Sequence, residues 1–367
     1  MANENLGAAK KAKNDEFYTQ FADIQKEMNA YLDYDPDVFR DKTILLPCDD
    51  PEWSNFTKYF AQNFETFGLK KLISTSYAPN SKPKEIPYQP TLFEMESEQF
   101  DEQKTIANGK IFTLTRDKTQ NGVINFEDLE WHYLEGDGDF RSSEITKLRD
   151  EADMIITNPP FSLFRQFIAW IIEGKKQFSI IGNMNAITYK EVFPLIKDDK
   201  LWLGVTRTGV GSMYFYLYEG APEKSGQIVE NGRRMQTIGN SAWFTNIDHG
   251  RRHKPLLLMT LEENLKFSSN KQIQSFGYQK YDNYDALEVP KVDAIPSDYE
   301  GIMGVPITFL GKHNPNQFEI LGSRRWAKSP DLVAAYIGDK TADSDFKTLI
   351  LGKETYDRIF IRHRRPT

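Results

Sequence analysis

Short apolar segments alternate with amphipathic segments in the middle of the chain, and no other feature of the sequence constrains the fold as strongly. Residues 154–157, 178–181 and 201–205 have the length and composition of buried strands. Between them, residues 162–173 and 189–196 place apolar side chains at helical spacing. Because parallel strands need crossover connections, this order predicts an α/β fold with a mostly parallel central sheet and helices on both of its faces.

The N-terminal part of the chain continues this pattern. Residues 42–46 and 71–75 predict two more buried strands, and the segment between them predicts a helix. Residues 14–32 repeat apolar side chains at the spacing of an amphipathic helix. After about residue 255 the chain is richer in Pro, Gly and Tyr. Since single cores rarely grow far past about 250 to 300 residues, we expect two domains, at 1–255 and 256–367.

The composition excludes several classes of protein. A single cysteine, Cys48, rules out an internal disulfide and a cysteine-based zinc cluster, and five scattered histidines lack metal-ligand spacing, so we expect no metal. The formal net charge of −7 argues against indiscriminate coating of nucleic acid but allows one basic face. No apolar run approaches the roughly 20 residues that span a bilayer, and the polar N-terminus lacks a secretion signal. We therefore expect a cytoplasmic protein with no membrane partner, and a monomer is consistent with these features.

The predicted strand 154–157 is followed directly by Asn158, Pro159, Pro160 and Phe161. Ligands of open parallel sheets bind outside the carboxyl ends of the strands, which is where Asn158 falls. Two hydrogen-bond acceptors at this position suit the activation of a conjugated amino group, such as that of adenine, whose lone pair is delocalised into the ring. The Asn158 side-chain oxygen and the Pro159 carbonyl can each accept one amino hydrogen and so localise that lone pair. The prolines fix the backbone without adding an N–H group, and Phe161 can stack on an extruded base. The alternative is a turn whose prolines only end the strand.

These four residues resemble the catalytic motif of amino-methyltransferases. Residues 48–56 (CDDPEWSNF), 72–77 (LISTSY), 243–246 (WFTN) and 304–309 (GVPITF) closely resemble the EcoRI-type adenine-specific DNA methyltransferase family, and the likeness runs from about residue 14 to the C-terminus. The resemblance implies a Rossmann-like methyltransferase fold, with S-adenosylmethionine bound in domain 1–255 and DNA target recognition in 256–367. It also implies methyl transfer to the N6 amino group of an adenine flipped out of double-stranded DNA, in a restriction-modification or orphan role.

The resemblance implies a cofactor pocket as well. S-adenosylmethionine carries an ammonium and a sulfonium group and no phosphate, so its loop can be acidic, as Asp49 and Asp50 are, where a dinucleotide loop must be glycine-rich. Residues 15–19 resemble the motif that closes over the methionine end, and residues 136–140 resemble the loop that reads the cofactor adenine. The implied cofactor residues are Phe17, Tyr18, Thr19, Cys48, Asp49, Asp50, Pro51, Ser76, Asp137, Asp139, Phe140 and Asn158.

Most of these assignments have a structural alternative. Asp49 and Asp50 can instead cap the helix that follows, residues 136–140 can form a solvated turn, and Phe17 and Tyr18 can belong to the core face of the first helix. The sequence also departs from the wider methyltransferase pattern, because no Gly-x-Gly loop follows the first strand and no acidic residue ends the second. The ribose-binding residue is therefore not assigned.

Positive charge is concentrated in short clusters after the catalytic motif, several of them beside aromatic residues. A single cluster of this kind is usually solvated surface, but together they predict one basic face that contacts DNA. The predicted DNA-binding residues are Arg233, Arg234, Arg251, Arg252, Lys254, Lys312, Arg324 and Arg325.

Two other functions remain open at this point. A protein glutamine N5-methyltransferase acts on the same kind of conjugated nitrogen with a similar Asn-Pro-Pro-aromatic motif, although such enzymes resemble a different layout with a glycine-rich cofactor loop. A catalytically inactive DNA-binding module would keep the basic face without turnover, and the intact Asn158 and Phe161 speak against it.

Overall fold

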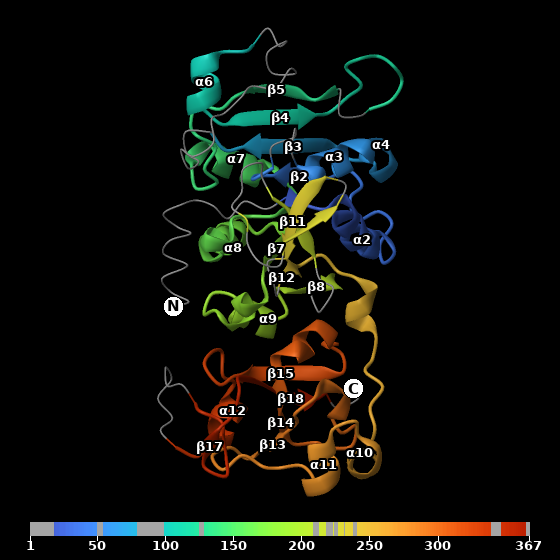
Figure 1. Cartoon of the computed structure of the whole chain (residues 1–367), viewed down its shortest axis with the longest axis vertical. Coiled ribbons are helices and arrows are strands. Elements are labelled where there is room, and N and C mark those ends of the chain that lie inside the picture. The colour runs from blue at the N-terminus through green and yellow to red at the C-terminus, as the bar shows by residue number, and fades with distance from the viewer. Residues whose placement is uncertain are drawn as a thin grey trace. The chain divides into compact units, whose positions relative to one another are not determined.

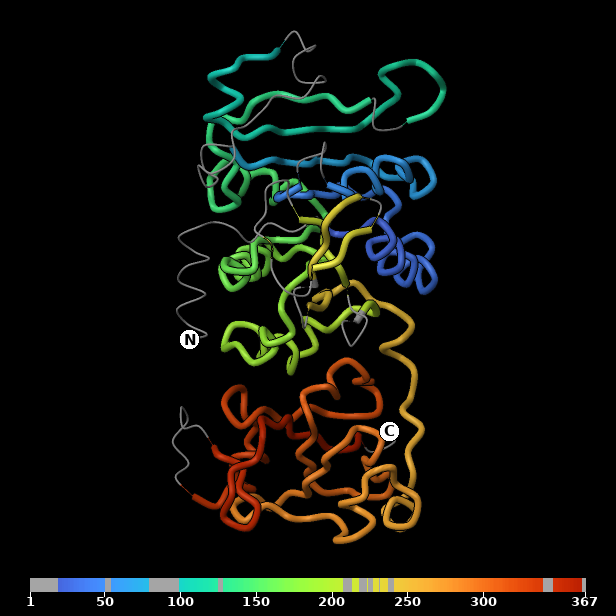
Figure 2. Tube along the Cα trace, in the orientation of Figure 1, coloured from blue at the N-terminus to red at the C-terminus, as the bar shows by residue number. Residues whose placement is uncertain are grey.

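The structure is a computed structural model, and its chain trace is drawn in Figures 1 and 2. It describes residues 18–49, 54–78, 99–124, 128–207, 213–217, 223, 227–230, 232–237, 241–338 and 346–364. The chain divides into two compact units, Met1–Ala186 with Gly204–Asp248, and Ile187–Leu203 with His249–Thr367. We call them the N-terminal unit and the C-terminal unit. A stretch of 17 residues from the middle of the chain thus belongs with the C-terminal unit.

An eight-stranded sheet has the order β5-β4-β3-β2-β6-β7-β12-β8. The four strands β3, β2, β6 and β7 are parallel to one another, whereas β4, β5 and β12 pair in the antiparallel sense. This architecture confirms the predicted α/β class. The strands are β2 (Thr43–Leu46), β3 (Lys71–Ser76), β4 (Lys110–Leu114), β5 (Glu130–Tyr133), β6 (Met154–Thr157), β7 (Gln177–Asn183), β8 (Trp202–Arg207) and β12 (Ser241–Thr245).

Helices cover both faces of this sheet. Consecutive residues of β2 and β6 are all buried, as expected for strands that are covered on both sides. On one face, Ile44 and Ile156 share a core cluster with Met28 and Phe60 of two helices. Figure 1 shows α2, α3 and α4 on one side of the sheet and α7 and α8 on the other. The helices of this unit are α2 (Phe21–Leu32), α3 (Asn55–Gln62), α4 (Phe64–Phe67), α6 (Glu102–Ala107), α7 (Ser143–Glu151) and α8 (Phe164–Glu173).

The N-terminal segment differs from its predicted helix. Residues Tyr18–Thr19 form strand β1, and helix α2 begins only at Phe21. Strand β1 pairs with β9 (Tyr214–Tyr216), about 200 residues away along the chain, and the small sheet is completed by β11 (Arg233–Thr237) and β10 (Gln227–Glu230). The prediction of one helix through residues 18 and 19 is therefore wrong, because pairing with a distant strand overrides the local spacing of apolar residues.

The C-terminal unit is built around a second sheet, of order β13-β14-β18-β15. Its core includes Tyr284, Leu332 and Phe360, and a hairpin of β16 and β17 lies in the same unit. The elements of this unit are α9 (Phe193–Lys197), α10 (Leu261–Phe267), α11 (Lys271–Phe276), β13 (Ala286–Glu288), β14 (Ile302–Pro306), β15 (Phe318–Ser323), α12 (Pro330–Ala335), β16 (Leu349–Ile350), β17 (Lys353–Glu354) and β18 (Arg358–His363).

Candidate active site

Asp49 connects three neighbouring strands at their carboxyl ends. It lies just after β2, with only 6% of its surface exposed. Its carboxylate accepts hydrogen bonds from the hydroxyl groups of Ser54 and Thr157, each at 2.6 Å. Its backbone N–H donates to the carbonyl of Thr75 at 3.0 Å, and its own carbonyl accepts from the Ser74 hydroxyl. One buried carboxylate therefore ties the loop after β2 to the end of β6, beside β3.

The capping alternative for Asp49 is wrong. The residue that caps α3 is Ser54, whose hydroxyl oxygen accepts from the backbone N–H of Phe56 at 3.1 Å. Asp49 supports the cap indirectly, because its carboxylate accepts the hydrogen of the Ser54 hydroxyl. Sequence reasoning missed Ser54 and Thr157 as partners of Asp49; the position of Ser54 at the start of a helix was the available signal for its capping role.

The motif 158–161 follows β6 directly. Thr157, the last residue of β6, is fully buried and holds Asp49, so Asn158 comes one residue after this connection. Pro159 is buried, while Asn158 and Phe161 are half-buried. The carbonyl of Pro160 accepts from the N–H of Leu163 at 2.9 Å and starts the short 3₁₀ helix η3 (Phe161–Leu163), which leads into α8. Phe161 packs against the core of the N-terminal unit.

The loop 136–140 is packed against the end of β3. Gly138 has a φ of +84°, and a Cβ atom placed there would lie 2.2 Å from the carbonyl oxygen of Ser76. The N–H of Ala78 donates to the carbonyl of Asp137 at 2.8 Å, and the Ser76 hydroxyl accepts from the N–H of Lys110 at 3.2 Å. The loop therefore lies at the same edge of the sheet as Asp49, and it is a close-packed turn and not a freely solvated one.

Two residues of this loop make specific contacts within the protein. The carboxylate of Asp139 accepts from Arg141, with Nε at 2.9 Å and a terminal nitrogen at 2.5 Å. The ring of Phe140 is buried, and its centroid lies 4.9 Å from that of Phe167 and 5.7 Å from that of Trp170, both on α8. The Phe140 side chain thus fixes the loop to α8.

The remaining predicted cofactor residues are described only in part. Phe17, Asp50 and Pro51 lie outside the described residues, as does the side chain of Tyr18. Thr19 is buried, and its carbonyl accepts from the Asn55 side-chain N–H at 2.7 Å, which connects β1 to the first residue of α3. Cys48 is half-buried.

The predicted DNA-binding residues fall into two groups. Arg252 and Arg324 are buried, with 8% of each residue exposed. Arg324 forms ion pairs with Glu354 and Asp357, both at 2.5 Å. In sequence these arginines look the same as their neighbours, but their guanidinium groups bind carboxylates of the protein. The other group is exposed or half-buried and comprises Arg233, Arg234, Arg251, Lys254, Lys312 and Arg325.

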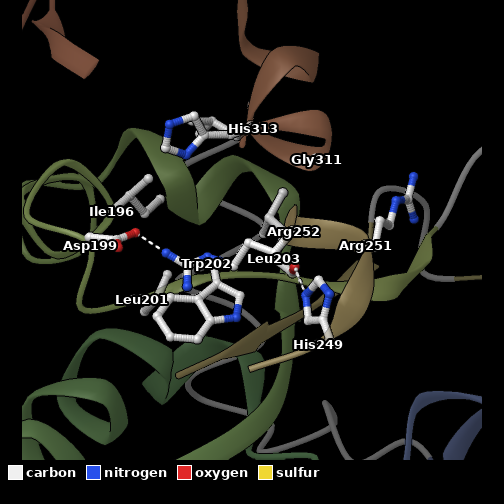
Figure 3. Close-up of a pocket in the computed structure, with 11 residues that line it drawn as sticks. Ile196, Asp199, Leu201, Trp202, Leu203, His249, Arg251, Arg252, Gly311 and His313 are labelled. Carbon is white, nitrogen blue, oxygen red and sulfur yellow. Dashed lines mark hydrogen bonds and ion pairs between the residues drawn. The ribbon is translucent and has the colours of Figure 1, made fainter. Parts of the chain in front are cut away.

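Arg252 lines a small pocket inside the C-terminal unit (Figure 3). Its guanidinium pairs with Asp199 and lies 3.7 Å from the centroid of the Trp202 ring, a close cation–π contact. The Arg251 side chain extends away from Arg252, Asp199 and Trp202.

Within the described part of the chain, no group of three or more His, Cys, Asp or Glu side chains is arranged to hold a metal ion. The same part contains no helix that is both long and apolar enough to cross a bilayer.

His313 lines the same pocket and makes the stability of the unit depend on pH. Burial lowers the pKa of His313 to about 4, against a weaker opposing effect of the hydrogen bond to the Phe318 carbonyl. The unfolded chain takes up this proton near pH 6.5, whereas the folded protein does not until about pH 4. Unfolding is therefore favoured as the pH falls from about 6.5 to 4, by at most roughly 1.4 kcal/mol per pH unit.

We expect His313→Gln to make this loss of stability with acid smaller. The urea midpoint of unfolding should fall less between pH 7.5 and pH 5 in the variant than in the unsubstituted protein. His253→Gln is the matched control, since that histidine is half-buried and is not among the residues that line the pocket. Equal acid sensitivity of all three proteins would show that His313 does not control this dependence.

Comparison with known proteins gives a consistent assignment. The profile of the family described as "Adenine-specific methyltransferase EcoRI" matches residues 5–364. The chain is 41% identical over 365 residues to the type II methyltransferase M.EcoRI of Escherichia coli, covering 99% of this chain and 97% of the relative. It is 33% identical over 368 residues to the type II methyltransferase M.MpnI of Mycoplasma pneumoniae, covering 97% of each. No solved structure matches the chain. The motif at the end of β6 and the buried Asp49 beside it agree with these matches. The chain belongs to the EcoRI family of adenine-specific methyltransferases.

Proposed function

We propose that this protein transfers a methyl group from S-adenosylmethionine to the N6 amino group of an adenine that is flipped out of double-stranded DNA, at a specific sequence. The observation that carries the proposal is the Asp49 carboxylate, which binds Thr157 and Ser54 and so keeps the acidic loop after β2 beside Asn158. A methyl donor and its acceptor must meet at one place, and this connection brings the two candidate loops together. Three relatives named as type II methyltransferases support DNA as the substrate.

The acceptor chemistry follows from the motif. The N6 nitrogen of adenine is a poor nucleophile because its lone pair is conjugated with the ring. In the proposal, the Asn158 side-chain oxygen and the Pro159 carbonyl would each accept one N6 hydrogen, which would draw the lone pair out of conjugation and make the nitrogen a better nucleophile. The transfer would form an N6–CH3 bond and break the S–CH3 bond of the donor, releasing the neutral thioether, and the proton lost from N6 would pass to solvent. Asn158 cannot take up this proton, so it would position the amine and is not a general base. Phe161 stacks on the extruded adenine.

The residues at the sheet edge fit S-adenosylmethionine. Among the described residues, the hydroxyl groups of Thr19 and Thr75 are buried without a hydrogen-bond partner, and buried polar groups normally have one. They lie on β1 and near the end of β3, the two strands that carry predicted cofactor residues. When bound, S-adenosylmethionine supplies a methyl group activated by the positive sulfonium. We propose that Thr19, Cys48, Asp49, Ser76 and the loop at Asp137 and Asp139 hold it, together with Phe17, Tyr18, Asp50 and Pro51.

The DNA contacts are proposed to come from the exposed basic residues and from the C-terminal unit. Arg233, Arg251, Lys254 and Lys312 contact phosphates, while residues 256–367 contribute the reading of the target sequence. We further propose that the protein acts as a monomer in the cytoplasm, with no metal ion in the reaction.

Methyl transfer from radiolabelled S-adenosylmethionine tests the proposal. Plasmid DNA should become labelled and a mixture of glutamine-containing proteins should not, and modification-sensitive sequencing should place the label on adenines within one short sequence. Labelling of protein would favour the glutamine methyltransferase. Cofactor binding in a calorimeter separates the third possibility, because an inactive DNA-binding module would bind DNA without binding S-adenosylmethionine at millimolar concentration.

A further inference from the structure

The C-terminal unit contains a groove between α11 and the hairpin of β16 and β17, which we call the α11 groove. Its volume is about 690 Å³, within the range of roughly 300 to 1,000 Å³ that is usual for ligand-binding clefts. Residues of α11 line one side, and β17 with the two residues that follow it lines the other. The lining residues that bear on its chemistry are Gln272, Glu288, Lys353, Glu354, Tyr356 and Arg358.

Most of the charged groups at this groove are neutralised by other residues of the unit. Arg358 donates to the carboxylate of Glu288, from Nε at 3.1 Å and from a terminal nitrogen at 2.6 Å. Glu354 forms an ion pair with Arg324 at 2.5 Å. Lys353 is exposed, and its ammonium has no hydrogen bond or ion pair within the described part of the chain. The lining therefore suits a ligand that is mostly neutral and carries a negative group at one edge.

Helix α11 presents the side-chain amide of Gln272 to the groove. The side chain of Asn270 caps this helix and accepts from the backbone N–H groups of Gln272 at 2.8 Å and Ile273 at 3.4 Å. Ile273 is 1% exposed and anchors the helix in the unit. Gln272 itself is exposed, and among the described residues its amide has no hydrogen-bond partner. One donor group and one acceptor group are thus available on a backbone that is already ordered.

The opposite wall is fixed in a similar way. The carboxylate of Asp282 accepts from the backbone N–H groups of Leu351 at 3.1 Å and Gly352 at 2.7 Å, which holds the hairpin turn directly before Lys353. Tyr356 follows the hairpin and is 87% exposed, although it lines the same groove. Its ring is an apolar surface that a partner can cover. The groove therefore combines an amide, an ammonium group and an aromatic ring, all of them accessible from solvent.

We propose that the α11 groove reads base edges of the DNA target and that Gln272 is a specificity-determining residue. The proposal rests on DNA being the substrate, as argued above. Base edges are neutral and carry donors and acceptors in fixed patterns, and a glutamine amide can bind N6 and N7 of an adenine in the major groove. The neighbouring phosphate is the negative group that Lys353 binds, a contact that positions the backbone and reads no base. Tyr356 makes an apolar contact beside the amide.

The sequence preference of methylation tests the role of Gln272. Modification-sensitive sequencing of plasmid DNA methylated by the full chain gives the preference for each base at every position of the target. A good bidentate pair discriminates between bases by roughly 5- to 150-fold, so Gln272→Ala should lose about this preference at one position and keep it at the others. Gln274→Ala is the matched control, because Gln274 is exposed on the same helix and does not line the groove. Equal urea midpoints of unfolding would show that all three proteins are folded.

The salt dependence of DNA binding tests the phosphate contact of Lys353. Each such contact contributes about 0.9 to the slope of log affinity against log salt concentration. Binding of a fluorescent duplex from 50 to 200 mM KCl should give a slope that is shallower by about 0.9 for Lys353→Gln, with the sequence preference unchanged. Lys200→Gln removes the same charge from another exposed lysine of the unit that does not line the groove, and its slope should equal that of the unsubstituted protein.

The proposal is rejected if Gln272→Ala keeps the full preference of the unsubstituted protein at every position of the target. A slope for Lys353→Gln that equals the slope for Lys200→Gln would likewise show that no phosphate is bound at the groove. Both results would leave the proposed function intact as long as the unsubstituted protein methylates one DNA sequence. A protein that methylates no DNA would overturn the function instead.

Discussion

Asn158→Ala is expected to lower the turnover number for DNA methylation by at least about 100-fold, the scale seen when one preorganised polar group is removed from an active site. Alanine cannot accept an N6 hydrogen, so the amine keeps its conjugated lone pair. Since Asp49, Ser54 and Thr157 still hold the sheet edge together, the affinity for S-adenosylmethionine should change by less than about threefold. Single-turnover methyl transfer and cofactor calorimetry measure these two quantities separately.

Asn158→Asp gives the comparison for this experiment. It keeps side-chain oxygens that accept hydrogen bonds, so it should retain more turnover than the alanine variant. If Asn158→Ala turned over DNA at an undiminished rate, the acceptor role of this residue would be disproved. If both variants lost cofactor binding together with turnover, the main role of Asn158 would be to bind the cofactor and not to position the amine.

Gly138→Ala is the second substitution with a large expected effect. Glycine is required there for two reasons, a φ of +84° and a new Cβ that would lie 2.2 Å from the backbone oxygen of Ser76. Ser76 is the last residue of β3 and is paired with Lys110 of β4, so it cannot move aside easily. We expect the free energy of unfolding to fall by more than about 3 kcal/mol, with weaker binding of S-adenosylmethionine because the loop 136–140 is displaced.

Gly122→Ala separates the two causes. Gly122 has the same φ of +84°, but a Cβ placed there meets nothing within 4 Å. This variant should therefore lose only the conformational contribution, on the order of 1 to 2 kcal/mol, and keep its cofactor affinity. Urea unfolding of both variants gives the difference directly. Equal losses in the two would mean that the contact with Ser76 is unimportant.

Much of the α/β core follows from local sequence. The boundaries predicted for the strand 154–157 match those of β6, because three apolar residues and Thr157 are followed, after Asn158, by two prolines that cannot continue a strand. The predicted helix 189–196 was less accurate, since α9 covers only Phe193–Lys197. Strand β1 could not be predicted, because its partner β9 lies near residue 215 and only the folded chain brings the two together.

The chemistry of single side chains was harder to predict than the fold. The sequence predicts that Asp49 belongs to the cofactor loop. Its partner Thr157 is 108 positions away, so the sequence does not show that Asp49 joins two strands. Likewise, nothing local distinguishes Arg324 from Arg325. Arg324 is buried and forms ion pairs with Glu354 and Asp357, about 30 residues downstream, whereas Arg325 is exposed.

The division of the chain has a practical consequence for protein engineering. The polypeptide passes from one unit to the other after residues 186, 203 and 248, so the two units are interleaved along the gene. A chimera that exchanges only residues 256–367 with a relative would pair a foreign partner with the native segment 187–203, including Thr188 and Lys190, which contact Trp326. Exchange of the C-terminal unit between family members therefore calls for grafting both stretches at once.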